Sequence, residues 1–338
     1  MGAKFLCGMY GGAFNPLHLG HVRDMIMAAN QCVKLVIVLC VTEGANEIDE
    51  DVRYRWIYQT MSHFPNVQIF TLHEKGKTKA SIPRDEWLRG AEEVKIFAKE
   101  PIDAVFYGED YGDGEIWSAC YPGATHVVFP RDDINSTQIR ENPYKFWDWM
   151  PQYVRSYFVK KVLVLGPEST GKSILVESLA KRFNTTFLEE VGRDWSQLSG
   201  TCQRMLPSDY TNILLRHKVK QMDLIQQANR VFIEDTNCVY TNYFLTFLAG
   251  KAADDRDLEL SLVLEQYWDY DLVILLKPTV RFVQDGDRSD EDPEARDRCY
   301  RFLRMHCMKH KTPIFEIDSP LYNNRFCEAE GAIERLLK

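Results

Sequence analysis

The stretch VLVLGPESTGKS occupies residues 162–173 and decides the fold of the C-terminal half. Val162 to Leu165 form an apolar run that is typical of a buried strand. A glycine-rich loop follows over 166–172, and apolar side chains then recur at helical spacing from Ser173 to Phe183. A strand, a glycine-rich loop and a helix in this order predict a phosphate-binding P-loop.

The residue types of this loop suit nucleotide phosphates. Gly166 and Gly171 let the loop wrap so that backbone N–H groups face phosphate oxygens, and the N-terminus of the next helix adds partial positive charge. Lys172 is expected to reach the β- and γ-phosphates, and the Ser173 hydroxyl to bind Mg²⁺. A chance glycine turn is the alternative, but such a match arises about once in a hundred sequences. We therefore expect ATP here at Gly166, Glu168, Ser169, Thr170, Gly171, Lys172 and Ser173.

A phosphoryl transferase also needs a carboxylate near the metal and positive charge near the transferred group. The apolar run that starts at Val231 ends in acidic residues, and Asp235 is our candidate metal ligand and catalytic residue. Arg193, Arg281 and Arg288 are candidate phosphate clamps. The segment 285–288, Asp-Gly-Asp-Arg, resembles a lid that brings the catalytic candidate Arg288 over ATP. Arginines that simply face solvent are the alternative.

A second phosphate-binding pattern lies near the N-terminus. An apolar run over 5–10 leads into Gly11 to His21, and a helical pattern follows over 22–30. The imidazoles of His18 and His21 can donate hydrogen bonds to triphosphate oxygens, and Gly20 lets a substrate approach the backbone. A zinc site would need a third ligand, and none is obvious. Two structural histidines are the other alternative.

The stretch INSTQIR at residues 134–140 adds to this pattern. Ser136 and Thr137 place hydroxyls ahead of a predicted helix start, and Arg140 follows one turn later. These residues offer N-cap chemistry and a second cationic phosphate clamp.

Strand-length apolar runs alternate with helical patterns in two series. This alternation predicts an α/β fold with parallel sheets. The chain has 338 residues, more than one core usually supports, so we predict two domains, 1–155 and 156–338, with a short packed connector. The predicted strands are 5–10, 35–41, 67–72, 104–107, 125–129, 162–165, 231–235, 272–276 and 314–317.

Composition narrows the class of protein. The net charge of −8 and the pI of about 5.6 argue against sequence-independent binding of nucleic acid, which needs a broad basic surface. The nine cysteines are scattered without a C-x-x-C pair, which is typical of a reducing cytosol. With no secretory signal and no apolar run of membrane length, we expect a cytoplasmic protein without a membrane partner. The sequence is compatible with a homo-oligomer as well as with a monomer.

Together these motifs resemble those of a known family. Gly11 to His21 resembles the G-x-F-x-P-x-H-x-G-H signature of the nucleotidyltransferase superfamily, and residues 134–140 resemble its I-S-x-T-x-I-R segment. With the P-loop half, the chain resembles over nearly its full length the bifunctional nicotinamide-mononucleotide (NMN) adenylyltransferase and ribosylnicotinamide kinase family, the NadR type. Further segments in family order are 107–112, 142–143, 154–160, 235–236 and 285–288.

The resemblance implies a Rossmann-like nucleotidyltransferase domain followed by a P-loop kinase domain. The kinase would phosphorylate the 5′-hydroxyl of nicotinamide riboside to give NMN, and the transferase would convert NMN and ATP to NAD and pyrophosphate. Both reactions need Mg²⁺. Trp87 would stack on nicotinamide and Glu109 would contact the nucleotide, although a core tryptophan is the alternative at Trp87. ATP in the N-terminal domain would meet Gly12, Phe14, His18, His21, Ser136, Thr137 and Arg140.

The sequence departs from the family at two positions, and other functions stay open. Asn135 stands where Ser is frequent, with little effect expected. Asn237 stands where a second Asp is frequent, so a weak kinase or a nucleotide-sensing regulatory domain is the alternative, as is another phosphoryl acceptor. Some relatives carry an N-terminal DNA-binding segment. Here the first predicted strand starts within a few residues of Met1, so we expect that segment to be absent.

Overall fold

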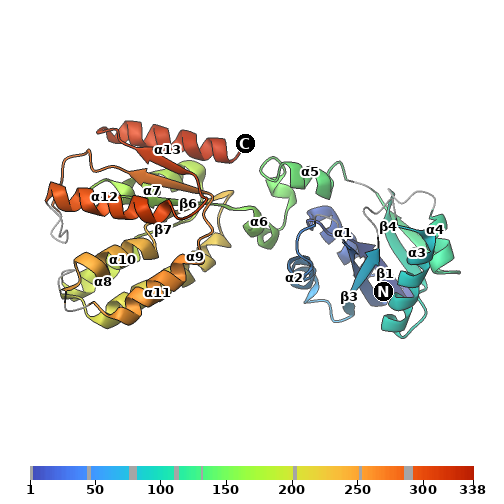
Figure 1. Cartoon of the computed structure of the whole chain (residues 1–338). Helices are drawn as coiled ribbons and strands as arrows, with labels where there is room; N and C mark the ends of the chain where they lie inside the picture. Colours follow the sequence, from blue (N-terminus) through green and yellow to red (C-terminus); the bar gives the residue numbers. More distant parts are fainter. Residues whose placement is uncertain are drawn as a thin grey trace. The chain divides into compact units, whose positions relative to one another are not determined.

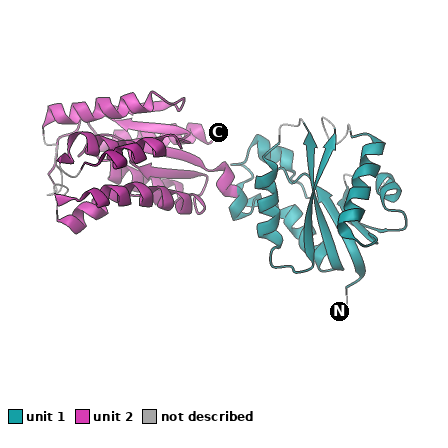
Figure 2. Ribbon diagram, turned by 60° about the horizontal axis from the view of Figure 1, so that its bottom comes forward, with its two compact units in different colours: residues 1–154 teal, residues 155–338 magenta. Residues whose placement is uncertain are grey.

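The computed structural model describes residues 3–43, 47–75, 82–109, 114–130, 132–200, 204–250, 253–284 and 292–338. It divides into two compact units, Met1–Val154 and Arg155–Lys338 (Figure 2). Each unit contains a five-stranded sheet in which the strands pair in parallel. The predicted α/β class with two parallel sheets is therefore confirmed.

The sheet of the first unit has the strand order β3-β2-β1-β4-β5 (Figure 1). Its strands are β1 (Phe5–Gly12), β2 (Cys32–Glu43), β3 (Val67–Lys75), β4 (Ala104–Gly108) and β5 (Thr125–Phe129). Its helices are α1 (Leu19–Ala29), α2 (Glu50–Met61), α3 (Arg84–Ala98), α4 (Glu115–Cys120) and α5 (Ser136–Glu141). A 3₁₀ helix (Trp147–Trp149) and α6 (Gln152–Phe158) follow.

Alternate side chains of β1 point to the same face of this sheet, where they pack under helices. Cys7 and Met9 lie in a buried cluster with Ala91 and Val94 of α3 and Trp117 of α4. The chain builds outward from β1 in one direction to β2 and β3, and in the other to β4 and β5. Such a reversal of strand order opens a crevice at the carboxyl ends of the strands, where ligands bind in parallel α/β folds.

The sheet of the second unit has the order β10-β9-β6-β8-β7. Its strands are β6 (Lys160–Leu165), β7 (Phe187–Leu188), β8 (Val231–Asp235), β9 (Leu272–Leu276) and β10 (Ile314–Ile317). Its helices are α7 (Lys172–Phe183), α8 (Val191–Ser199), α9 (Pro207–Ile225), α10 (Cys238–Phe247), α11 (Asp255–Glu265), α12 (Pro293–Cys307) and α13 (Tyr322–Leu336).

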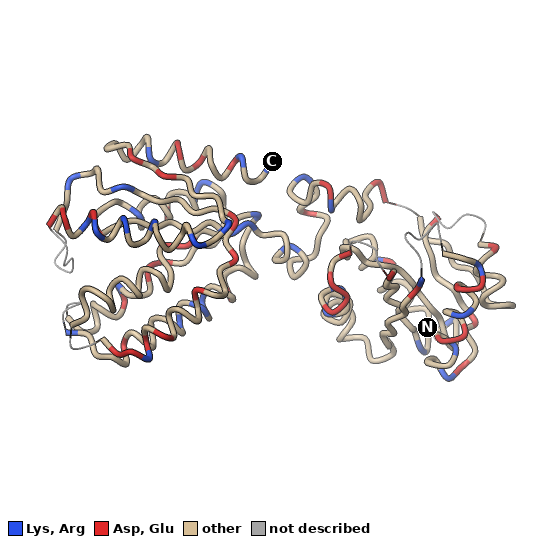
Figure 3. Tube along the Cα trace, viewed as in Figure 1, with Lys and Arg blue, Asp and Glu red and all other residues tan. Residues whose placement is uncertain are grey.

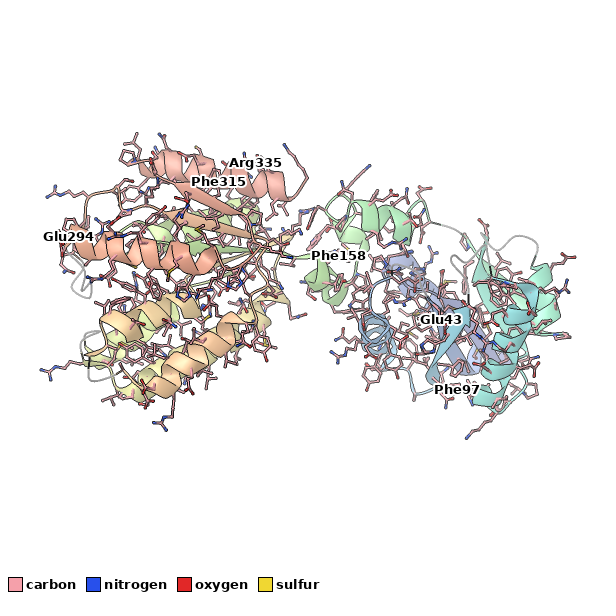
Figure 4. All side chains as sticks on the ribbon, in the orientation of Figure 1. Glu43, Phe97, Phe158, Glu294, Phe315 and Arg335 are labelled. Atoms are coloured by element: carbon pink, nitrogen blue, oxygen red, sulfur yellow. The ribbon has the colours of Figure 1, made fainter. Side chains whose placement is uncertain are left out.

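Both faces of this second sheet are buried, as the continuous apolar runs of its strands require. Val162 and Val164 of β6 pack with α7 and α13, whereas Leu163 and Leu165 pack with α10 and α12. Full burial of each such side chain contributes roughly 1.5–3 kcal/mol. At the rim, the guanidinium of Arg335 lies 5.6 Å from the ring centre of Phe315 (Figure 4).

The nine predicted strands are all present, and one further strand, β7, was missed. It has only two residues, too few to give a periodic signal. Acidic and basic residues are interspersed along the helices of both units (Figure 3). Within the described ranges, no helix is both long and apolar enough to span a bilayer.

Candidate functional sites

The loop between β6 and α7 has backbone geometry that only glycine tolerates at two positions. Gly166 has φ of 159° and Gly171 has φ of 83°. A Cβ at Gly166 would lie 2.8 Å from the carbonyl oxygen of Leu276, and a Cβ at Gly171 would lie 2.5 Å from the ring of Tyr322. Gly171 is also the N-cap of α7, so the backbone N–H groups of this helix start face the loop.

Lys172 is held within its own loop. Its side chain is buried, and the ammonium donates to the carbonyl oxygen of Pro167 at 3.1 Å. The ammonium also lies 4.8 Å from the ring centre of Tyr240, which stabilises a cation. The hydroxyl of Thr170 donates to the same carbonyl at 2.8 Å. Phosphate oxygens would be far stronger partners for the ammonium than one carbonyl, so the lysine is poised to bind them.

Two buried arginines that the sequence analysis did not single out hold this loop from behind. Arg325 of α13 donates to the carbonyl oxygens of Thr170 and Lys277, each at 2.8 Å. Arg296 of α12 donates to the carbonyl of Glu168 at 3.3 Å. Neither arginine belongs to a motif, and only their positions on helical apolar faces distinguish them from surface arginines.

Asp235 ends β8 as a fully buried carboxylate. Neither of its oxygens has a hydrogen-bond partner of ordinary geometry in the described part of the chain, although the nearby Ser173 hydroxyl favours the ionised form. Burial raises the pKa of Asp235 to about 6, Lys172 opposes the shift, and Glu190 adds to it.

An unsatisfied buried carboxylate is costly unless a cation binds it. Asp235 and Ser173 therefore fit a Mg²⁺ ion whose other ligands are phosphate oxygens and water. The described residues contain no cluster of three or more His, Cys, Asp or Glu that could hold a metal without such help.

A cavity of about 330 Å³ opens beside Lys172. Its walls come from the P-loop, from α8 and α9, and from the start of α10. Aromatic and aliphatic side chains such as Tyr210 and Phe244 alternate with polar ones, as in sites for small polar ligands. Glu190, which follows β7, was missed by the sequence analysis, although an acid at the end of a strand is the same signal that identified Asp235.

The three candidate arginine clamps differ in position. Arg193 lines the cavity and pairs with Glu190 at 3.8 Å. Arg281 is exposed and does not line the cavity. Arg288, with the predicted lid 285–288, lies outside the described residues.

Asn237 lines the cavity, but its side-chain oxygen is already engaged. It is the N-cap of α10, and its Oδ1 accepts a hydrogen bond from the backbone N–H of Val239 at 3.1 Å. An N-cap satisfies a donor that the helix cannot satisfy itself, and Asn serves as well as Asp. Asn237 therefore has a structural role, the capping of α10, that is independent of catalysis.

In the first unit, His18 and His21 stack at the start of α1. Their ring centres are 3.7 Å apart, and the backbone N–H of His18 donates to Nδ1 of His21 at 3.4 Å. Burial lowers the pKa of His18 to about 4, so its ring is neutral near pH 7. Its Nδ1 is buried without a partner among the described residues. The described chain supplies no third metal ligand beside the pair.

Gly20 lies close to a carboxylate of the protein itself. A Cβ there would lie 2.4 Å from Oδ2 of Asp132, which pairs with Arg23 at 2.8 Å. The glycine therefore makes room for Asp132, and the approach of a substrate at this point stays a prediction.

The structure brings the two N-terminal motifs together. Arg140 of α5 donates to the carbonyl oxygen of Asn15 and, at 3.2 Å, to the hydroxyl of Thr137. The hydroxyl of Ser136 donates to the carbonyl of Pro16 at 2.9 Å. The helix begins at Ser136, so Ser136 and Thr137 lie in its first turn rather than ahead of it, and the N-cap is Asn135, whose amide oxygen accepts from the backbone N–H of Gln138 at 3.0 Å. At the end of β1, Gly12 lies under the ring of Phe14, which a Cβ would meet at 3.0 Å.

Trp87 packs in the core of the first unit, edge to face with Trp117 at 5.2 Å between ring centres. It also lines a cavity of about 20 Å³ that reaches Gly11 at the end of β1. Glu109 follows β4 and is exposed. Their contact with nicotinamide stays a prediction.

The chain is similar to known proteins in its C-terminal half and over nearly its full length. Residues 161–325 match the model of a family described as an AAA domain. The chain is 29% identical to the "Trifunctional NAD biosynthesis/regulator protein NadR" of Escherichia coli (strain K12), over 99% of this chain and 84% of that protein.

Two solved structures share the fold over 99% of this chain. One is a NadR protein in complex with NAD and AMP-PNP, at a TM-score of 0.78, 20% identity and 98% coverage of that chain. The other is a NadR protein in complex with NR, at a TM-score of 0.78, 23% identity and 96% coverage. The resemblance that the sequence motifs indicated is therefore confirmed.

Proposed function

Because the chain is a homologue of the NadR proteins, we propose that it is a bifunctional enzyme of NAD salvage that works in the cytoplasm. The domain of residues 156–338 phosphorylates nicotinamide riboside to NMN, and the domain of residues 1–155 transfers the adenylyl group of ATP to NMN. The observation that carries the kinase assignment is the cavity of about 330 Å³ that Lys172 of the P-loop lines, which is large enough for an acceptor. The buried carboxylate of Asp235 interacts electrostatically with the same lysine.

In the kinase, Lys172 and the loop N–H groups hold the β- and γ-phosphates. Ser173 and Asp235 would hold a Mg²⁺ ion, which would neutralise phosphate charge. The 5′-hydroxyl oxygen of the riboside attacks the γ-phosphorus while the bond to the β,γ-bridging oxygen breaks, giving NMN and ADP. Glu190 lines the cavity and is the carboxylate that we propose takes the hydroxyl proton. Arg193 and, on closure, Arg288 supply positive charge.

In the transferase, a phosphate oxygen of NMN attacks the α-phosphorus of ATP and pyrophosphate leaves. No covalent enzyme intermediate is needed, so catalysis consists of positioning and charge stabilisation. His18 is neutral and acts as a hydrogen-bond donor, whereas Arg140 supplies fixed positive charge. Trp87 and Glu109 are the proposed nicotinamide contacts.

The alternative is a weak or nucleotide-sensing regulatory P-loop domain, and it rests on Asn237, whose amide oxygen caps α10. A chain that binds nucleotide without turnover would still show no product in the assay that follows.

The test is a product assay on the purified chain with ATP, MgCl₂ and either nicotinamide riboside or NMN. We expect Lys172→Ala to abolish formation of NMN and ADP while NAD synthesis from NMN continues, and His18→Ala to do the reverse. Lys181→Ala and His63→Ala are matched controls, since both side chains are exposed. If only NMN is converted, the kinase assignment fails; if neither substrate is converted, the nicotinamide assignment fails for both halves.

A further inference from the structure

His217 lies on the wall of the kinase cavity, and the proposed mechanism gives it no role. It belongs to the buried face of α9, which also carries Tyr210, Ile213, Leu214 and Gln221. This face packs toward β8, so the imidazole stands between the sheet and the cavity. A histidine at a cavity wall offers either a donor or an acceptor, depending on which ring nitrogen bears the hydrogen.

The contacts of one ring nitrogen settle the tautomer. Nε2 of His217 lies 3.2 Å from the carbonyl oxygen of Thr236 and 3.1 Å from Oε1 of Glu234. A backbone carbonyl can only accept a hydrogen bond, so Nε2 must carry the hydrogen. Glu234 is itself held in place, because Gln221 donates to its Oε2 at 2.7 Å and the Tyr270 hydroxyl donates to its Oε1 at 2.9 Å.

The other ring nitrogen is then an acceptor. Burial lowers the pKa of His217 to about 4, so the ring is neutral near pH 7 and Nδ1 keeps its lone pair. Nδ1 has no hydrogen-bond partner within the described ranges of the chain, and it is not among the sealed polar atoms of the interior. The ring lines both the kinase cavity of about 330 Å³ and a smaller cavity of about 20 Å³, and only the first has room for a ligand.

We propose that Nδ1 of His217 accepts a hydrogen bond from a hydroxyl or amide N–H of the phosphoryl acceptor, and so selects acceptors that carry a donor at that place. This inference rests on the proposed kinase function. The donor is a ribose hydroxyl or the N–H₂ of a carboxamide, the two donor classes that nicotinamide riboside offers.

Because Nε2 is anchored, the ring of His217 cannot turn to present a donor, and its other nitrogen can only accept a hydrogen bond. Rotation of the ring to present a donor would break the bond to Thr236, which has the positive φ of 66° that is unfavourable for a β-branched residue. The backbone N–H of Thr236 donates to the carbonyl oxygen of Val164 at 3.1 Å, and the carbonyl oxygen of Thr236 accepts from His217. A ligand lacking the donor would leave Nδ1 buried and unpaired, the situation that gives the largest discrimination in enzyme sites.

Two substitutions test the roles of the two ring nitrogens separately. In His217→Gln, the amide nitrogen can take the place of Nε2 and keep the bond to Thr236, but nothing replaces Nδ1. In His217→Asn, the shorter side chain can place an oxygen near the position of Nδ1 but cannot reach Thr236. Thermal unfolding of both full-length variants reports whether either one loses its fold.

The experiment measures kcat/KM of the full-length protein for nicotinamide riboside, its 2′-deoxy and 3′-deoxy analogues, and nicotinic acid riboside, which lacks the amide N–H. For the wild type, we expect kcat/KM for nicotinamide riboside to exceed that for one of the three analogues by about 100-fold or more. His217→Gln should reduce that ratio to about 3-fold, with the KM for ATP unchanged, whereas His217→Asn should keep more of it despite lower stability.

Each outcome bears on a separate claim. A wild type that treats the four ribosides alike, or a His217→Gln variant that keeps the wild-type ratio, overturns the inference and leaves His217 as a structural anchor. A wild type that phosphorylates none of them overturns the proposed kinase function, and the inference with it. If His217→Gln does not fold, His217→Met, which also lacks an acceptor at the position of Nδ1, is measured in its place, and a retained wild-type ratio in that variant overturns the inference.

Discussion

At the scale of single residues, the carboxylate of Asp235 links the kinase reaction to pH. Its pKa is raised to about 6, mainly by burial, and only the ionised form binds a cation. As the pH falls through 6, the ionised fraction falls, so kcat/KM of the kinase for ATP should drop about tenfold per pH unit. A profile of kcat/KM between pH 5 and 8 measures this, and a flat profile would contradict the assigned role.

The same shift has the opposite sign for stability. The folded state holds the proton of Asp235 more tightly than the unfolded state, whose pKa is near 3.8, so ionisation above pH 6 costs folding free energy. Asp235→Asn should therefore abolish the kinase and yet raise the free energy of unfolding of its unit at pH 8, by about 1–3 kcal/mol. Well below pH 3.8, where Asp235 is protonated in both states, the gain should disappear. Denaturant titrations at pH 8 and at the lowest pH that preserves the fold test this.

Asn237 gives a second prediction at this scale. Because its oxygen caps α10, Asn237→Ala should lower the free energy of unfolding by about 1 kcal/mol, and Asn237→Asp should keep the cap. Asp at this position should change kcat of the kinase by less than about threefold, because the structure gives the residue a capping role. A hundredfold gain in kcat would instead show that the chain lacks a catalytic carboxylate there.

At the scale of elements, the P-loop depends on α13 through one buried arginine. Arg325 donates to the carbonyls of Thr170, Lys277 and Ser319 and to the hydroxyl of Thr279. Arg325→Met leaves these acceptors unsatisfied, so we expect a loss of about 3–5 kcal/mol and weaker ATP binding. Arg182→Met is the matched control. Arg182 joins α7 to Glu330 of α13 on the surface, and its loss should cost less than about 1 kcal/mol. Equal losses in the two variants would refute the bracing role.

The elements also show where sequence reasoning succeeds. In the second sheet, β6, β8 and β9 contain continuous apolar runs because both faces of the sheet are buried, and strand-length apolar runs predict them. The short β7 has no such run, and the acid that follows it, Glu190, was missed with it. The motifs identified Lys172, which starts α7 after the P-loop, and Asp235, which ends β8; β6 and β8 pair directly. Arg325 and His217 were not predicted, because their roles depend on partners far along the chain.

At the scale of the whole molecule, the sequence predicts two domains and the structure has two units with separate sheets and cores. The spacing of motifs does not predict which helices line the cavity beside the P-loop. Here that space is lined by α8, α9 and α10, whose sequences carry no signature. The lid predicted at 285–288 lies outside the described residues, and its role stays a prediction.

The two units should fold and react separately, and α6 determines where the chain can be cut. The first half of α6 belongs to the first unit: Val154 is fully buried, and the hydroxyl of Tyr153 contacts that of Thr60. The sheet of the second unit starts only at Lys160. A fragment 1–158 should therefore unfold cooperatively and make NAD from NMN at a kcat within a few-fold of the full chain.

A fragment 1–150 is the control for that cut. It has the same sheet and the same proposed ATP residues but lacks Tyr153 and Val154, so we expect it to be less stable by about 2–4 kcal/mol. Denaturant unfolding and the NAD assay on both fragments measure the difference. An inactive but folded fragment 1–158 would mean that the transferase site needs residues of the second unit, which would overturn the assignment of one reaction to each domain.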